Sequence, residues 1–292
     1  MNNNSENTSW HFYTTNEAGW EAMLKACRDA EVSIDLEQFI FETNDIGQKF
    51  LEVFIKKAKE GVKVRLLWDA AGSFSFYGSS IVEELKRQNI ELQFFKTLFP
   101  SFFRVHNYKS WYFRNHKRTL IVDSKIGFTG SICVSDEMIN WRDTAVKLEG
   151  NVVKEMEMGF ERMWRRAQSK KLGIMRNEPS QNEFRYISNY PFPSKRHLYS
   201  EIVNAIRNAK SHIYITTPYF VPTRHLFKVL RSIAKRGVDI KIIIPESSDH
   251  PIVDLCSRAF FTQAFKSGIR IYLHKGEMIH NKTIIIDDEW ST

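Results

Sequence analysis

HKRTLIVD, at residues 116–123, returns in altered form as HNKTIIID at residues 280–287. Both stretches consist of His, any residue, a cation, four mostly apolar residues and Asp. From ordinary residue frequencies, two such matches in one chain of 292 residues would arise in roughly one sequence in a thousand. The alternating pattern predicts a strand that places His and the cation on one face and ends at Asp. The chain is therefore predicted to contain the same unit twice.

The flanking sequence repeats the same order of elements. In each half a helix precedes a strand, and a second helix ends in a basic stretch and Gly before a further strand. These elements lie at residues 22–30, 33–41, up to Gly61 and 62–67, and again at 202–209, 211–220, up to Gly237 and 238–244. A third match pairs residues 89–92 with 268–271, and 152–167 carries apolar residues at helical spacing. This alternation predicts an α/β fold with a helix-covered sheet in each half.

Composition gives the domain boundaries. We expect a disordered lead over residues 1–8, a first domain over 9–167, a polar linker over 168–183 and a second domain over 184–292. Charged residues make up 26% and hydrophobic residues 42%, which excludes wholesale disorder and a fibrous fold.

Charge and cysteine usage narrow the partners and the compartment. The net charge of +8 favours anionic partners: phospholipid surfaces, nucleic acid or phosphorylated small molecules. Cys27, Cys133 and Cys256 lie far apart, so neither a zinc knuckle nor a disulfide framework is predicted, and a reducing compartment is expected. Nowhere do about 18 apolar residues run without charge, so any membrane contact should be peripheral.

Two histidines and two cations suit the chemistry of a phosphodiester. Its phosphorus is shielded by negative oxygens, so attack needs a nucleophile, positive charge and an acid for the departing alkoxide. A neutral imidazole can attack, while a protonated imidazole donates to the leaving oxygen. This chemistry requires no metal and no cofactor.

With these residues the chain resembles the phospholipase D superfamily, whose signature is His-x-Lys-x4-Asp followed after six residues by Gly-Gly or Gly-Ser. Residues 130–131, Gly-Ser, follow the first motif at that spacing. Among its members the chain is most similar to bacterial cardiolipin synthases, through residues 34–41, 61–69, 141–150 and 217–222. The resemblance implies a pseudo-twofold duplication with two mixed β-sheets flanked by helices.

The resemblance assigns the histidines their roles. One of His116 and His280 becomes a phosphohistidine and the other acts as general acid and base; we assign the nucleophile to His116. Asp143 matches the position of an acid that orients the histidine, fixing its tautomer and stabilising the imidazolium. The alternative is that Asp143 only pairs with Arg142 or occupies a turn.

The remaining motif residues receive supporting roles. The resemblance implies that Arg118 and Lys282 hold the phosphoryl oxygens, with Ser131 near them. Asp123 and Asp287 are expected to be structural, bonding backbone near the site. The alternative for Ser131 is an ordinary tight turn.

Three features depart from the superfamily pattern. Arg118 stands where Lys is usual, which keeps the charge but changes its shape. Cys133 stands where Asn is usual, which removes an amide donor and acceptor. The sequence stops at Thr292, five residues after Asp287, so we expect a fragment or a truncated reading frame.

A basic and aromatic insertion precedes the first motif. Residues 96–118 hold six cations and seven aromatic residues and no acid. We interpret it as a lipid-facing lip, because basic side chains attract anionic headgroups and aromatic rings favour the bilayer interface. The alternatives are a surface for single-stranded nucleic acid and a loop that buries its own rings.

The resemblance leads to the functional prediction. We expect a cytoplasmic, peripheral membrane phosphatidyltransferase that acts on phosphatidylglycerol at an anionic membrane surface and makes cardiolipin. The alternatives are a hydrolase of the same superfamily, either a phospholipase or a nuclease, and an inactive lipid-binding remnant. Nucleic acid is the less favoured partner, and the sequence gives no oligomeric state.

Overall fold

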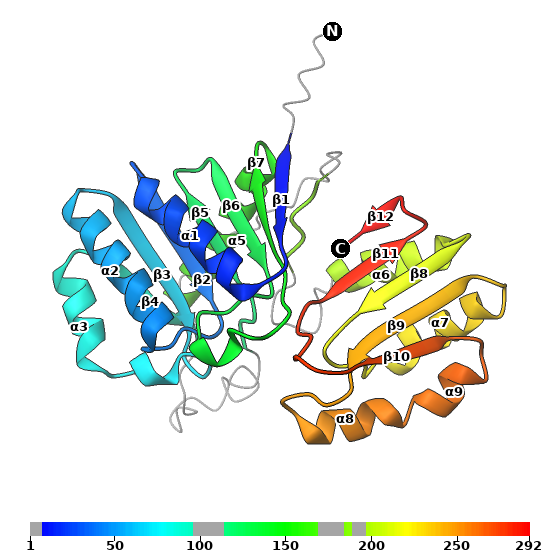
Figure 1. Ribbon diagram of the computed structural model, residues 1–292. Helices are drawn as coiled ribbons and strands as arrows, with labels where there is room; N and C mark the ends of the chain where they lie inside the picture. The colour runs from blue at the N-terminus through cyan, green and yellow to red at the C-terminus, as the bar shows by residue number, and fades with distance from the viewer. Residues whose placement is uncertain (1–7, 96–113, 169–183, 189–196) are drawn as a thin grey trace, which may run out of the picture. The chain divides into compact units, whose positions relative to one another are not determined.

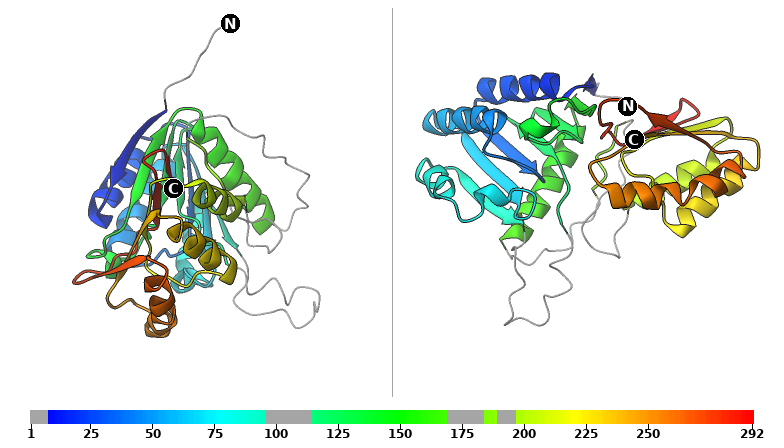
Figure 2. Two further views of the ribbon diagram at one scale, coloured as in Figure 1. Left: turned by 90° about the vertical axis from the view of Figure 1, so that its right-hand side faces the viewer. Right: turned by 60° about the horizontal axis from the view of Figure 1, so that its bottom comes forward.

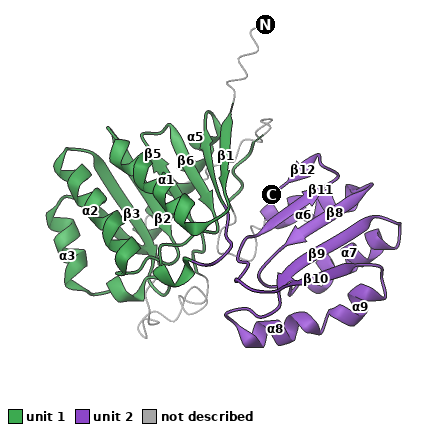
Figure 3. Cartoon of the chain, in the orientation of Figure 1, with its two compact units in different colours: residues 1–139, 145–195 green, residues 140–144, 196–292 purple. Residues whose placement is uncertain are grey.

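The fold is known from a computed structural model that describes residues 8–95, 114–168, 184–188 and 197–292 (Figure 1). The chain forms two compact units: unit 1 comprises residues 1–139 and 145–195, and unit 2 comprises 140–144 and 196–292 (Figure 3). Each unit holds one mixed β-sheet with helices. The predicted α/β class, with two mixed sheets flanked by helices, is confirmed.

The seven-stranded sheet of unit 1 has the order β1-β7-β6-β5-β2-β3-β4. Strands β2, β3 and β4 are parallel, and the remaining neighbours are antiparallel. The strands are β1 (Ser9–Tyr13), β2 (Ser33–Gln38), β3 (Lys63–Asp69), β4 (Glu91–Phe95), β5 (Thr119–Val122), β6 (Ile126–Gly130) and β7 (Ala145–Glu149).

Helices cover both faces of this sheet. The helices are α1 (Asn16–Asp29), α2 (Asp45–Lys59), α3 (Ser80–Arg87) and α5 (Val152–Ala167), the last with the predicted bounds. One apolar cluster fills the space under α1 and α2, and a second, including Met156 and Phe160, lies under α5. Figure 2 shows α5 on the face opposite α1. Both faces of the sheet are covered, so β2 and β3 are almost continuously buried, and the buried Asp35 of β2 forms an ion pair with Arg65 of β3.

Unit 2 repeats the central part of that sheet. Its order is β10-β9-β8-β11-β12, with β8, β9 and β10 parallel and the rest antiparallel, the same pairing as β4-β3-β2-β5-β6. The strands are β8 (His212–Thr216), β9 (Asp239–Pro245), β10 (Arg270–His274), β11 (Thr283–Ile286) and β12 (Trp290–Ser291). The helices are α6 (His197–Asn208), α7 (Arg224–Ala234), α8 (Pro251–Arg258) and α9 (Phe261–Phe265).

The predicted helix ends are confirmed at both repeated glycines. Gly61 follows α2 with a φ of 92°, and Gly237 follows α7 with a φ of 97°. Only glycine adopts this left-handed backbone conformation at little energetic cost. The conformation ends each helix, so that β3 and β9 can begin.

Three kinds of boundary differ from the prediction. Strands β2 and β8 end at Gln38 and Thr216, before the apolar runs end. Both motif strands begin after the cation, because His and the cation lie beyond the residues that pair with β2 and β8. Residues 184–188 belong to unit 1, where Phe184 and Tyr186 pack against the cluster under α5. Apart from Thr8 and Gln168, the expected lead and linker lie outside the described residues.

Candidate active site

His116 lies just beyond the carboxyl end of β2. Thr119, the first residue of β5, pairs with Glu37, so the preceding residues extend past this edge of the sheet. The His116 ring stacks on Phe39, with 3.8 Å between ring centroids and an interplanar angle of 21°. His116 remains exposed, so a substrate can reach its ring.

A buried polar network anchors the backbone around His116. The Asn115 backbone N–H donates to Asp69 (3.0 Å), and its side-chain amide donates to Glu37 (2.6 Å). Burial raises the pKa of Glu37 and lowers the pKa of Lys117, and each charge offsets part of the other's shift. This network was not predicted from the sequence. Its signal was an acid at the carboxyl end of each of two buried parallel strands.

Arg118 is held on two sides within unit 1. Its Nε donates to the Cys133 sulfur at 2.9 Å, and its Nη1 donates to the His116 carbonyl oxygen at 2.9 Å. The guanidinium carbon also lies 5.8 Å from the centre of the Phe39 ring. Ser131 is buried two residues before Cys133, at the end of β6.

Asp123 and Asp287 close equivalent turns after β5 and β11. Each carboxylate accepts three backbone N–H bonds of 2.7–2.9 Å, from residues 31–33 and 210–212 respectively. Both residues have left-handed backbone, with φ values of 53° and 56°. Burial would raise the pKa of Asp123, but the three N–H donors outweigh it and hold the pKa below its usual value. Each carboxylate thereby holds the backbone at the start of β2 or β8.

Replacing Asp123 with Asn should therefore lower stability in a pH-dependent way. The depressed pKa means that the carboxylate stabilises the fold above the unfolded pKa of about 3.9 and stops doing so as the pH falls through the folded value. We expect a loss of about 1 kcal/mol at pH 7 by urea denaturation and a much smaller loss near pH 3. The control is Glu137→Gln, on an exposed side chain. An equal loss at both pH values would contradict this account.

The second motif forms a hydrogen-bonded triad within unit 2. His280 Nδ1 lies 2.7 Å from Asp143 Oδ2, and Lys282 Nζ lies 3.1 Å from His280 Nε2. The Asp143 side chain is fully buried, and 8% of the His280 side chain is exposed. Because a carboxylate only accepts and an ammonium only donates, this arrangement selects the Nδ1–H tautomer, with the lone pair on Nε2.

Asp143 reaches His280 because residues 140–144 are part of unit 2 (Figure 3). The Arg142 N–H donates to the Met278 carbonyl and the His280 N–H donates to the Arg142 carbonyl, both at 2.8 Å. The Trp141 and Tyr219 rings lie 5.3 Å and 6.5 Å from the His280 ring. Both aromatic residues lie in stretches that resemble cardiolipin synthases, but neither was predicted to belong to the site.

The described residues thus form one cluster in each unit. Unit 1 brings His116 and Arg118 together, and unit 2 brings Asp143, His280 and Lys282 together. Except for residues 114–118, the expected lipid-facing lip lies outside the described residues. Within the described ranges no group of three or more His, Cys, Asp or Glu side chains could hold a metal ion.

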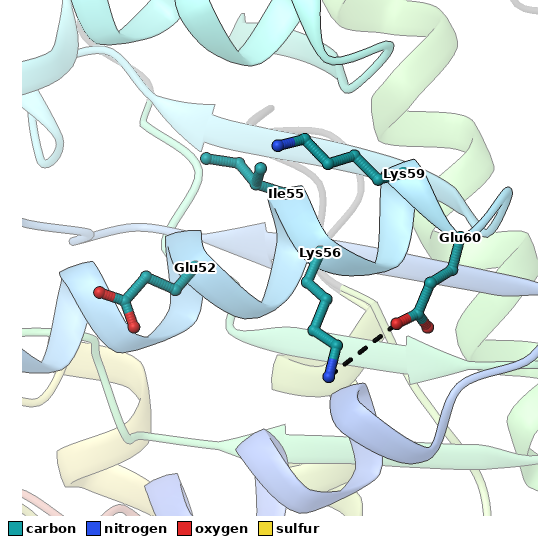
Figure 4. Close-up of a pocket in the computed structure, with 5 residues that line it drawn as sticks. All are labelled: Glu52, Ile55, Lys56, Lys59 and Glu60. Atoms are coloured by element: carbon teal, nitrogen blue, oxygen red, sulfur yellow. Dashed lines mark ion pairs between the residues drawn. The ribbon is translucent and has the colours of Figure 1, made fainter.

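A separate surface hollow lies on α2 and involves none of these residues (Figure 4). It is lined by Glu52, Ile55, Lys56, Lys59 and Glu60. Lys56 and Glu60 form an ion pair at 4.0 Å, one helical turn apart. We assign this hollow no role.

A duplicated sheet that carries the His-x-cation-x4-Asp motif at the same strand of each copy defines a phospholipase D-like protein. The chain matches the family described as "Cardiolipin synthase, PLD-like domain" over residues 23–164 and 202–292, and it belongs to this family. The resemblance predicted from the motifs is confirmed.

Curated relatives agree with this assignment. The chain is 32% identical over 311 residues to the cardiolipin synthase of Clostridium perfringens (strain SM101 / Type A), covering 98% of this chain and 64% of the relative. It is 29% identical over 310 residues to cardiolipin synthase 1 of Bacillus anthracis, covering 99% of this chain and 60% of the relative. The chain therefore spans less than two thirds of these relatives.

A solved structure supports the fold. The phosphatidylserine synthase of Haemophilus influenzae matches with a TM-score of 0.64 at 12% identity, over 96% of this chain and 76% of that chain. In the part of the chain that the structure describes, no helix is both long and apolar enough to span a bilayer.

Proposed function

We propose that the protein is a phosphatidyltransferase that makes cardiolipin from phosphatidylglycerol through a phosphohistidine. The hydrogen bond between His280 and the buried Asp143 carries this proposal. A buried carboxylate on Nδ1 stabilises the imidazolium, as a general acid and base requires. The cardiolipin synthases among the relatives indicate the substrate class.

The proposed reaction has two displacements at one phosphorus. His116 attacks the phosphorus of one phosphatidylglycerol, and an N–P bond forms as the P–O bond to the headgroup glycerol breaks. Protonated His280 gives its proton to the departing glycerol oxygen. A hydroxyl of a second phosphatidylglycerol then loses its proton to His280 and attacks the phosphohistidine, which releases His116 and cardiolipin.

The two motif cations offset the charge on the reacting phosphoryl group. Lys282 lies beside the Nε2 atom of His280, where the proton transfer would occur. Arg118 donates to the backbone carbonyl oxygen of His116, the residue whose imidazole would form the N–P bond. Donors that are already oriented stabilise the charge that develops in the transition state.

The test is to incubate the chain with phosphatidylglycerol vesicles in the presence of a chelator and to identify the products by mass spectrometry. We expect cardiolipin and free glycerol in equal amounts. Phosphatidic acid without cardiolipin would instead identify a hydrolase that uses water as the acceptor. Cleavage of single-stranded DNA without lipid turnover would identify a nuclease.

We also propose that each unit contacts the membrane at the edge of its own sheet that carries its motif. In unit 1, Phe74 follows β3 and is 65% exposed. In unit 2, α8 follows β9 and exposes Ile252 (79%) and Leu255 (72%). Tyr219 lies between α8 and the motif, because its ring is near both His250, which precedes α8, and His280. Apolar side chains at this edge would enter the lipid around the headgroup.

The variant Ile252→Asp/Leu255→Asp should therefore bind phosphatidylglycerol vesicles at least about tenfold more weakly, because two apolar insertions become charged. Co-sedimentation with sucrose-loaded vesicles measures this binding. Turnover of a monomeric short-chain phosphatidylglycerol should stay within about twofold, since α8 holds no reacting group. The matched control is Val32→Asp, which alters an apolar residue that is 64% exposed at the opposite end of β2. Equal losses in both variants would refute this surface.

A further inference from the structure

The two residues that depart from the superfamily pattern in the first motif contact each other. Arg118 replaces the usual Lys and Cys133 replaces the usual Asn, and the Arg118 Nε donates to the Cys133 sulfur at 2.9 Å. The residues lie 15 positions apart, on either side of the β5–β6 hairpin. Because the two departures form one contact, they have one explanation.

The Cys133 sulfur is a fixed acceptor. The residue is fully buried, and its carbonyl oxygen accepts a hydrogen bond from the Trp20 indole at 2.7 Å. The next residue, Val134, bonds the segment after β2 through its N–H to Ile40 and its carbonyl to Glu42. The Cys133 Sγ donates to the Ser131 carbonyl oxygen at 4.0 Å. The sulfur lone pairs then accept from the Arg118 N–H.

This contact sets the direction of the guanidinium. With Nε on the sulfur and Nη1 on the His116 carbonyl, the plane of the Arg118 side chain is fixed. Its Nη2 amino group makes no hydrogen bond to the described residues. A planar fork with free donors binds two phosphate oxygens at once, whereas a lysine ammonium acts as a point charge.

We infer that Cys133 is a positioning residue that aims the Arg118 guanidinium at the phosphoryl oxygens beside His116. The first motif then binds phosphate through two donors of one guanidinium. Cys133 supports this binding and does not indicate an inactive site. The identity of the bound phosphate ester depends on the proposed function, whereas the Arg118–Cys133 contact does not.

A double-mutant cycle tests the inference. We expect Cys133→Ala to lower kcat/KM on phosphatidylglycerol about tenfold when Arg118 is present, and to change it less than about twofold in an Arg118→Lys background. Cys133→Ser keeps an acceptor of similar size and should restore most of the lost activity. Losses that multiply in the double variant would overturn the inference, because a merely structural cysteine would cost the same in both backgrounds.

A second readout separates this inference from the proposed function. Binding of inorganic phosphate to the same four proteins, followed by ³¹P NMR, should show the same coupling between positions 118 and 133. If the unmutated chain makes no cardiolipin but phosphate binding shows the coupling, the proposed function is wrong and the inference about Arg118 and Cys133 is retained. The matched control is Cys27→Ala, another fully buried cysteine outside both motifs, which should leave both readouts within about twofold.

Discussion

Replacing His116 with alanine should abolish cardiolipin formation, with a fall in kcat of about 10⁴-fold or more, because no N–P bond can form without the imidazole. Replacing His280 with alanine should cost less, about 10²- to 10⁴-fold, because it removes only proton transfer. Both are measured from initial rates with phosphatidylglycerol vesicles.

The leaving group distinguishes the two roles. In a phosphatidyl ester of p-nitrophenol, the leaving group departs as a stable phenolate and needs no proton from the protein. His280→Ala should therefore show a burst of about one p-nitrophenol per active site on this ester, and protein denatured in detergent at neutral pH, where the N–P bond survives, should carry the phosphatidyl group. His116→Ala should show neither. The reverse pattern would exchange the two roles, and no burst in either variant would contradict the phosphohistidine.

The control for both variants is His11→Ala, which alters an exposed histidine on β1. It should leave rates within about twofold. If His116→Ala kept full turnover on phosphatidylglycerol, the nucleophile would lie elsewhere.

Local patterns were sufficient to predict most of the fold. The repeated order of helix, strand, helix and strand, together with the glycines at 61 and 237, depends on backbone preferences and burial within one element, which single-sequence patterns report directly. The strand ends were less predictable, because they depend on where the neighbouring strand stops pairing.

The contacts between the site residues could not be predicted from the sequence. Nothing near Asp143 in the sequence shows that its carboxylate meets His280, 137 positions away, because that contact depends on residues 140–144 packing into unit 2. The Arg118–Cys133 contact could not be predicted for the same reason. In the sequence, each residue is only a departure from the superfamily pattern. Both contacts, Asp143 with His280 and Arg118 with Cys133, arise from tertiary structure.

Replacing Asp143 with Asn should lower the rate on phosphatidylglycerol about 10²- to 10⁴-fold while leaving the fold intact. An amide has nearly the same shape, but it carries no charge to stabilise the His280 imidazolium, and its NH₂ group can turn the ring to the wrong tautomer. Initial rates measure the loss, and an unchanged melting temperature shows that the fold survives.

The leaving group again separates orientation of His280 from a structural role for Asp143. If Asp143 acts only through His280, its loss should matter little for the burst on the p-nitrophenyl ester, which needs no proton donor. Asp288→Asn is the matched control, since Asp288 contacts His212 at 3.2 Å outside the motif and is 84% exposed. A double variant with His280→Ala should be no slower than His280→Ala alone, because a positioning residue has nothing left to position. Losses that multiply would instead give Asp143 a role independent of the histidine.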